Sequence, residues 1–185
     1  MSHKTVEFGL EDEEKEYLLG QVKKSIKARL DNGDLPDDVP ESAVLKEKRG
    51  GFVTLKKGGE LRGCIGYIEA YKPLYQTIRE MAQAAAFDDP TFPEVDISEW
   101  PELEFEISVL TPLREIDDPE IIEVGRDGLL IRHGSSSGLL LPQVPVEQGW
   151  SREEFLAHTC MKAGLASDCW RRSECHLFIF SAEVF

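Results

Sequence analysis

The sequence lacks any apolar run approaching 18 residues, so it contains no predicted membrane-spanning helix. Its first residues also lack the apolar stretch of a signal peptide, and we therefore expect a cytoplasmic protein. Internal repeats and low-complexity tracts are absent as well. A chain of 185 residues with 41% hydrophobic content is long enough for an ordinary core. We expect residues 1–185 to form a single domain.

Basic residues are in deficit, with 21 lysines and arginines against 35 acidic residues and a net charge of −14. A protein that binds nucleic acid through phosphates needs a positive surface, so this charge argues against a nucleic-acid partner. One cluster has two interpretations, a local basic patch or solvated lysines that protect a sheet edge. The second is favoured. The cluster consists of Lys46, Lys48, Arg49, Lys56 and Lys57.

The chain has four cysteines, Cys64, Cys160, Cys169 and Cys175, and no Cys-x-x-Cys pair. They are enough for two disulfides, but in a cytosolic chain we expect free thiols. A zinc site built from the last three and His176 would need irregular spacing, so we predict no metal and no cofactor. The default interpretation is that buried thiols act as small hydrophobic side chains.

Hydrophobic periodicity predicts three main helices. The first covers 11–30, the second starts at Pro73, and the third is capped by Ser151 and ended by Gly164. Strands are expected between them, most of them joined by hairpins. The predicted class is therefore α+β, with a largely antiparallel sheet packed against about three helices. The predicted strands are 43–48, 52–57, 61–68, 101–112, 121–124, 129–132, 138–141 and 175–185.

The segment GFVTLKKGGELRGCIGYI, residues 51–68, predicts a tight hairpin. Its Gly58-Gly59 pair suits a two-residue turn in which both residues need positive φ. Counting outward from that turn places Leu55 opposite Arg62 and Val53 opposite Cys64. Because paired residues share a sheet face, Arg62 and Cys64 are expected to be neighbours on one face.

Cys64 has two interpretations. In the functional one, the Arg62 guanidinium lowers the thiol pKa, and Gly63 and Gly66 let a ligand approach the strand. In the structural one, Cys64 is a buried small side chain and the glycines make room for a helix. Residue types and spacing alone favour the structural interpretation. The candidate bases for a reactive thiol are Glu106, His133 and His158.

The hexapeptide Leu-Arg-Gly-Cys-Ile-Gly, residues 61–66, resembles the signature of the AMMECR family. That family takes its name from a chromosomal region linked to Alport syndrome, intellectual disability, midface hypoplasia and elliptocytosis. The similarity continues through AAAFDDPTFPEV, EFEISVLTP, GRDGLLIRHGSSSGLLLPQV, EQGW and CMKAGL. These segments occur in order over nearly the whole chain, so the chain is identified as a member of this family.

The resemblance implies a larger α/β lobe and a smaller lobe with a cleft between them, the signature strand lying near it. It also implies a pathway shared with MEMO-type and radical-SAM proteins, and a small-molecule or protein substrate. The positions it marks first are Arg62, Gly63, Cys64 and Gly66. The positions it marks less strongly are Asp89, Pro90, Glu106, Gln143, Glu147 and Trp150.

These interpretations of Cys64 and its neighbours lead to two alternative functions. In the first, the chain is a cysteine-centred enzyme or enzyme subunit, with Cys64, Arg62 and Glu106 as catalytic residues. Its substrate would be bound at Gly63, Gly66, His133, Gln143 and Glu147. In the second, the same cleft belongs to a non-catalytic binding or adaptor module. A thiol with a lowered pKa favours the enzyme, and an inert thiol favours the binding module.

Overall fold

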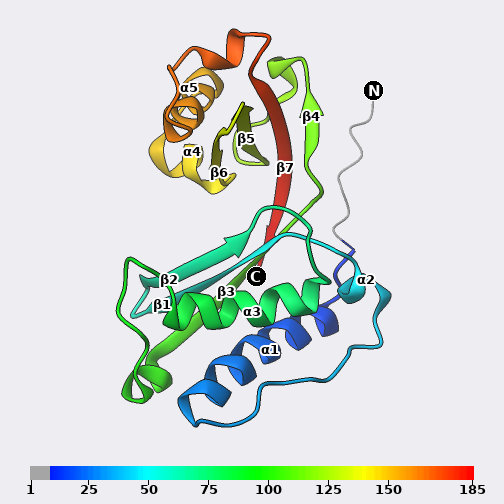
Figure 1. Cartoon of the computed structure of the whole chain (residues 1–185), viewed down its shortest axis with the longest axis vertical. Helices are drawn as coiled ribbons and strands as arrows, with labels where there is room; N and C mark the ends of the chain where they lie inside the picture. The colour runs from blue at the N-terminus through cyan, green and yellow to red at the C-terminus, as the bar shows by residue number, and fades with distance from the viewer. Residues whose placement is uncertain (1–8) are drawn as a thin grey trace. The chain divides into compact units, whose positions relative to one another are not determined.

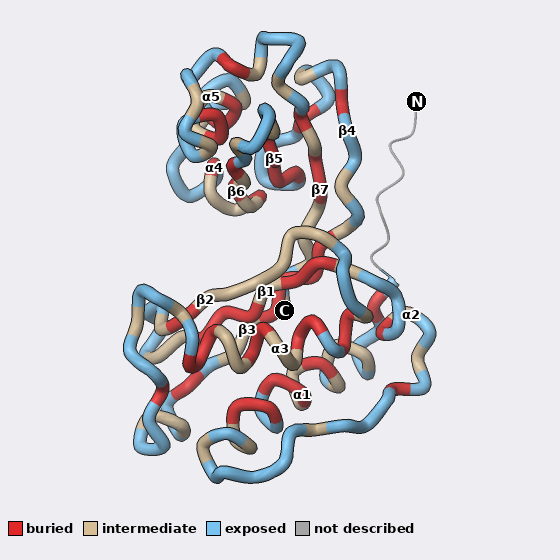
Figure 2. The backbone as a smooth tube through the Cα atoms, viewed as in Figure 1, coloured by how far each residue is buried: buried red, intermediate tan, exposed pale blue. Residues whose placement is uncertain are grey.

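The computed structural model describes residues 9–185, which divide into two compact units. Unit 1 contains the described residues through Leu110 together with Glu183–Phe185, and unit 2 contains Thr111–Ala182. Figure 1 shows the elements of each unit, and Figure 2 shows where their buried residues lie. No helix among the described residues is both long enough and apolar enough to cross a membrane.

The sheet of unit 1 is built on the predicted hairpin. Strands β1 (Gly51–Lys57) and β2 (Glu60–Tyr67) pair in antiparallel fashion across Gly58 and Gly59, whose φ angles are 60° and 78°. These positive angles confirm the turn predicted from the Gly-Gly pair. Strand β3 (Leu103–Leu110) pairs with the other edge of β1, so β1 is central. The backbone of Phe185 exchanges two hydrogen bonds with Ile107 of β3.

Two helices cover one face of this sheet. Helix α1 (Asp12–Leu30) begins with a capping box on Glu11, and α3 (Leu74–Phe87) begins after Pro73. Helix α3 packs on both strands of the hairpin and on α1 (Figure 1). The two helices and the sheet enclose the main core. Polar groups are therefore expected on the opposite face of the sheet, which points away from these helices. The fully buried core includes Leu18, Val22, Ile26, Val53, Leu55, Leu74, Ile78 and Ile107.

The predicted strand over 43–48 is wrong. Residues Ala43–Lys46 form a short helix, α2, because the Ser42 side chain accepts a hydrogen bond from the Leu45 backbone N–H at 3.3 Å. Gly50 therefore does not turn between two strands. It is buried, and a Cβ there would lie 2.4 Å from the Ile68 carbonyl oxygen.

The strands of unit 2 pair in antiparallel fashion in the order β4-β7-β5-β6. Its core is formed where α5 packs on β5 and β6. The predicted cap at Ser151 is confirmed at the start of α5, where it forms a capping box with Glu154, and Gly164, with φ 75°, follows the end of the helix. The strands are β4 (Arg114–Ile116), β5 (Asp127–His133), β6 (Ser136–Leu140) and β7 (His176–Val184), and the helices are α4 (Gln143–Gln148) and α5 (Arg152–Lys162).

The predicted strand over 121–124 is also wrong. A 3-10 turn, Pro119–Ile121, forms there because the Asp118 carboxylate accepts a hydrogen bond from the Glu120 backbone N–H at 2.9 Å. The sequence does not predict strand β4 or helix α4, because three and six residues are too few to show a clear hydrophobic periodicity. Further 3-10 turns are Ile97–Glu102 and Cys169–Arg171. The α+β class with largely antiparallel strands is confirmed.

Candidate functional site

A β-bulge at Arg62 changes the register of the hairpin. Lys57 pairs with Glu60 as predicted, and Lys56 pairs with Leu61 in the same register, but Leu55 pairs with Gly63. Arg62 is the extra residue that the bulge inserts into β2. The predicted pairs of Leu55 with Arg62 and of Val53 with Cys64 are therefore wrong.

Cys64 pairs with Thr54 instead, and Thr54 also pairs with Glu106 on β3. Since directly paired residues point to the same face, these three side chains form a row across the sheet. Val53 and Leu55, which alternate with Thr54, pack in the core under α1 and α3. The row of Cys64, Thr54 and Glu106 consequently lies on the face that points away from the two helices.

The contacts of Cys64 are with oxygen atoms. The Thr54 hydroxyl donates a hydrogen bond to Cys64 Sγ at 3.3 Å. The backbone N–H of Cys64 donates to Asp89 Oδ2 at 2.9 Å, and the Thr91 N–H donates to Asp89 Oδ1 at 2.8 Å. Asp89 thus forms a turn just after the end of α3 and also binds the outer edge of β2.

Burial raises the pKa of the Cys64 thiol above its ordinary value. The nearby Asp89 and Glu106 carboxylates raise that pKa further, and the Thr54 hydrogen bond opposes them without reversing the direction. A protonated thiol is a weak nucleophile. The prediction that a guanidinium lowers the pKa of this thiol is therefore wrong.

The charge of Arg62 is neutralised elsewhere. Its Nε and Nη2 atoms donate to the two carboxylate oxygens of Glu99 at 3.0 and 2.9 Å, and Nη2 also reaches the Glu94 carbonyl oxygen at 3.4 Å. This hydrogen-bonded pair lowers the pKa of Glu99 to about 2. The buried Nη1 atom of Arg62 has no hydrogen-bond partner among residues 9–185. The guanidinium fixes the segment after α3 against the bulge.

Glu106 is near Cys64 but is itself paired. Its Oε2 atom lies 2.7 Å from the Lys56 ammonium, and both side chains are about one third exposed. Of the three predicted catalytic residues, the fold therefore brings Cys64 and Glu106 onto one face, while Arg62 binds Glu99.

Gly63 and Gly66 both have a packing reason. A Cβ on Gly63 would lie 2.2 Å from the Ala85 carbonyl oxygen of α3, and one on Gly66 would lie 2.3 Å from the Phe52 ring. Both distances are far below contact, so these positions admit only glycine unless the backbone moves. The close approach of α3 and of Phe52 accounts for both glycines without a ligand.

The remaining predicted residues belong to unit 2. His133 is the exposed last residue of β5, next to the turn at Gly134, where φ is 58°. Gln143 is the first residue of α4, and Glu147 is exposed on the same helix. Their predicted role in substrate binding stays a prediction.

Two further candidates, Trp150 and His158, are in contact with each other. Their rings stack 3.8 Å apart with 4° between their planes. Trp150 also packs against the core cluster of unit 2 that contains Phe155. Stacking on Trp150 gives His158 a structural contact.

All four cysteines are free thiols. Cys160 and Cys169 are buried in the core of unit 2, and Cys175 packs against it. Burial, followed by hydrogen bonds with the other two thiols, raises the pKa of Cys169. Within residues 9–185, no group of three or more His, Cys, Asp or Glu side chains is arranged to hold a metal ion.

The fold and the signature strand define an α+β protein with a sheltered thiol on an edge strand. The AMMECR1 family model matches residues 20–185, and the chain belongs to this family. Protein MK0488 of Methanopyrus kandleri is 49% identical over 182 residues, covering 94% of this chain and 88% of that protein. The crystal structure of the uncharacterized protein PH0010 from Pyrococcus horikoshii is similar, with a TM-score of 0.85 and 44% identity, over 95% of this chain and 92% of that one.

Proposed function

We propose that this chain is a non-catalytic binding module rather than a thiolate enzyme. The observation that carries the proposal is the surroundings of Cys64. Burial and, to a lesser extent, two carboxylates raise the pKa of the thiol, and the guanidinium of Arg62, which was expected to lower it, is bound to Glu99. At neutral pH the thiol is protonated, so it contributes shape and a weak hydrogen bond to a binding face.

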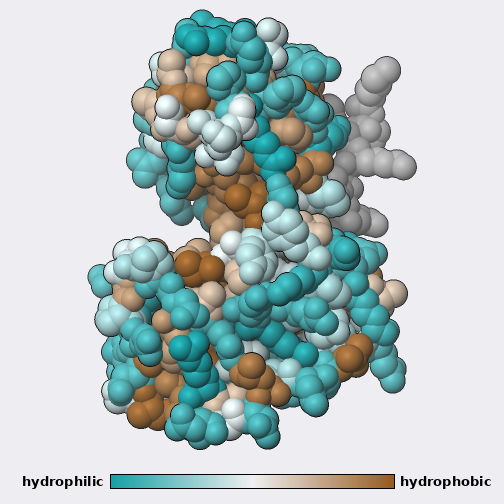
Figure 3. Space-filling view, in the orientation of Figure 1, coloured by the Kyte–Doolittle hydropathy of each residue, from teal (hydrophilic) through white to brown (hydrophobic). Residues whose placement is uncertain are grey.

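The proposed binding face is the row of Cys64, Thr54 and Glu106 together with Lys56. The side chains of Lys56 and Glu106 are 36% and 31% exposed, so both can exchange their mutual ion pair for contacts with a partner. Hydrophilic residues cover much of the visible surface of each unit (Figure 3), and the net charge is −14. This charge favours a partner with a basic surface, because opposite charges steer association.

The family resemblance offers MEMO-type and radical-SAM proteins as candidate partners, and the MEMO-type protein of the same genome is the first to test. We expect Cys64→Ser to bind it within about twofold of the unchanged chain, measured by isothermal titration calorimetry. Glu106→Lys should weaken binding by about tenfold or more, since it places a second cation beside Lys56. The matched control is Lys23→Glu on α1, an exposed charge reversal away from this face. Loss of binding in Cys64→Ser, or no change in Glu106→Lys, would overturn the proposal.

A cysteine-centred enzyme acting on a small or protein-borne substrate is the second candidate. The placement of Glu106 and Thr54 beside the thiol favours it, because a substrate that displaced Lys56 would leave Glu106 as a base. The thiol proton would pass to Glu106 as sulfur attacks the carbonyl carbon of a thioester. The carbon–sulfur bond of that thioester then breaks, and the departing thiolate takes the proton from Glu106. Intact-protein mass spectrometry with an acyl thioester probe distinguishes the two candidates. Transfer of the acyl group to Cys64, lost in Glu106→Gln, supports the enzyme, and no transfer supports the binding module.

A further inference from the structure

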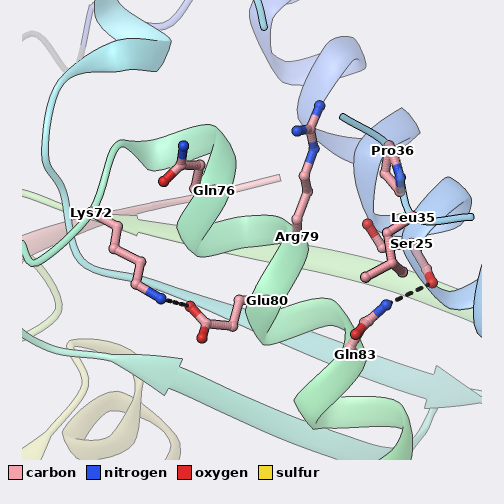
Figure 4. Close-up of a pocket in the computed structure, with 8 residues that line it drawn as sticks. All are labelled: Ser25, Leu35, Pro36, Lys72, Gln76, Arg79, Glu80 and Gln83. Carbon is pink, nitrogen blue, oxygen red and sulfur yellow. Dashed lines mark hydrogen bonds and ion pairs between the residues drawn. The ribbon is translucent and has the colours of Figure 1, made fainter. Parts of the chain in front are cut away.

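Unit 1 contains a pocket of about 270 Å³ between α1, α3 and the loop that connects α1 to α2. Figure 4 shows its lining side chains. Helix α3 contributes Gln76, Arg79, Glu80 and Gln83. Positions 76 and 80, and likewise 79 and 83, are four residues apart, so these side chains lie on one side of the helix. No short motif marks such a site, since its walls come from three separate segments.

The loop over this pocket is held by a polar network. Arg79 Nε donates to Gln21 Oε1 at 2.7 Å, and Arg79 Nη2 donates to Asp38 Oδ1 at 2.9 Å. The other oxygen of Asp38 accepts hydrogen bonds from the Tyr17 hydroxyl at 2.8 Å and from Gln21 Nε2 at 3.0 Å. These bonds join the loop to both helices. The wall formed by Leu35 and Pro36 is therefore in place before any ligand arrives.

One polar atom in the lining lacks a partner. Ser25 is only 1% exposed, and its Oγ atom makes no hydrogen bond to any of the described residues. The carbonyl oxygen of the same residue accepts a hydrogen bond from Gln83 Nε2 at 3.3 Å (Figure 4). Buried hydroxyls are nearly always hydrogen-bonded in folded proteins.

The rim of the pocket carries one charge of each sign. Lys72 Nζ lies 2.7 Å from Glu80 Oε2, and both side chains are more than 40% exposed. An ion pair this exposed contributes little to stability, so exchanging it for two ligand contacts costs little. Arg79 is already bound to Asp38, which leaves Glu80 to repel phosphates and other multiply charged anions.

We propose that this pocket binds a zwitterion of amino-acid size. Its carboxylate pairs with Lys72, its ammonium with Glu80, and its apolar side chain packs on Leu35 and Pro36. Binding leaves no charge without a partner, because the ion pair between Lys72 and Glu80 is replaced by two ion pairs with the ligand. The volume fits a small metabolite rather than a nucleotide or a folded partner. The inference is independent of the role of Cys64.

The probes are L-leucine and two analogues that each lack one charge, L-leucinamide and 4-methylpentanoate. Chemical-shift changes of the backbone amides of α3 and of the loop, recorded by two-dimensional NMR during titration, report binding. We expect L-leucine to bind with a dissociation constant on the order of 1 mM, given its few atoms. Each analogue should bind about tenfold more weakly. Equal binding of all three, or no shifts with leucine up to about 20 mM, would overturn the proposal.

Variants identify the partners of each charge. Lys72→Met should weaken the binding of leucine and of 4-methylpentanoate about tenfold, because both pair a carboxylate with Lys72. It should leave the binding of leucinamide, which has no carboxylate, unchanged. Glu80→Gln should weaken leucine and leave 4-methylpentanoate unchanged. The matched control is Lys27→Met, which breaks a similar exposed pair with Asp31 at 2.8 Å. If Lys27→Met and Lys72→Met change leucine binding equally, the ion pair of Lys72 with Glu80 has no role in binding.

Discussion

Cys64 of unit 1 and Cys169 of unit 2 both have a raised pKa, but they differ in what surrounds them. Cys64 is half-buried on an edge strand beside a hydroxyl and two carboxylates. Cys169 is 3% exposed in a hydrophobic cluster, beside other thiols. Burial is the largest cause at both sites. The difference teaches that a raised pKa alone does not distinguish a half-buried thiol on an edge strand from a core thiol, because their exposure and polar neighbours differ.

The largest expected effect is on alkylation in the native state. Cys160 and Cys169 should react with iodoacetamide slower than Cys64 by a factor on the order of 10³ or more, because their core must open first. Cys64 should itself react slowly at pH 7.5 and faster as the pH approaches its raised pKa. Peptide mapping by mass spectrometry gives each rate. Similar rates for Cys64 and Cys169 would remove the distinction between the two sites.

The next largest effect is on the free energy of unfolding. It tests one closely packed glycine in each unit, Gly63 in unit 1 and Gly138 in unit 2. A Cβ on Gly63 would lie 2.2 Å from the Ala85 carbonyl oxygen, and one on Gly138 would lie 2.4 Å from the Ala163 backbone nitrogen. We expect Gly63→Ala and Gly138→Ala each to lower the free energy of unfolding by about 2–3 kcal/mol, since backbone must move. Denaturant unfolding measures this. Gly20→Ala is the control, because no atom lies within 4 Å of its added Cβ.

The control should stabilise the chain by about 0.5–1 kcal/mol, as alanine does in the interior of a helix. Gly138→Ala should also speed the alkylation of Cys160, which lies on the adjacent helix α5. If Gly63→Ala proved as stable as the unchanged chain, close packing would no longer explain that glycine.

A smaller effect follows from the pair of Arg62 and Glu99. The pKa of Glu99 in the folded chain is about 2, below its ordinary 4.5, so the pair stabilises the fold above pH 4.5. That stability is lost as the pH falls from 4.5 through about 2, because protonation is harder in the folded state. With solvent screening the contribution is about 1–2 kcal/mol. Glu99→Gln should flatten the stability profile in this window, whereas the exposed Glu16→Gln should not.

The smallest effect concerns the charge beside Cys64. Glu106→Gln removes a carboxylate that raises the thiol pKa and releases Lys56 from its ion pair. Both changes favour the thiolate, so alkylation of Cys64 at pH 7.5 should become roughly threefold faster. Arg62→Ala should leave this rate nearly unchanged, as the guanidinium is bound to Glu99. A marked slowing in Arg62→Ala would show that arginine does activate the thiol.

The sequence predicts the hairpin but not its register. Positive φ at Gly58 and Gly59 follows from residue type, so the turn is a local property. The bulged residue Arg62 is hydrogen-bonded to Glu99, which is 37 residues away in the sequence. Counting alternation outward from the turn cannot detect such a contact. The predicted strand partners of Arg62 and Cys64 and the predicted direction of the Cys64 pKa both followed that count, and both were wrong.

The same limit applies to the rest of the candidate site. Helix α2 replaces a predicted strand because one side chain, Ser42, caps four residues. The pocket combines Ser25, Leu35 and Glu80 from three segments, and each of these residues has an ordinary surface or core explanation within its own segment. Periodicity identifies long elements such as α1 and β3 well, since many residues repeat one signal.

The backbone pairing of Phe185 with Ile107 has a consequence for synthesis. The chain leaves unit 1 after Leu110 and returns to it only at Glu183. A ribosome therefore makes all of unit 2 before it makes the residues that pair with this part of β3. Until then the nascent sheet has an uncovered border at Ile107, and a chain stalled within unit 2 would carry that border exposed to other chains.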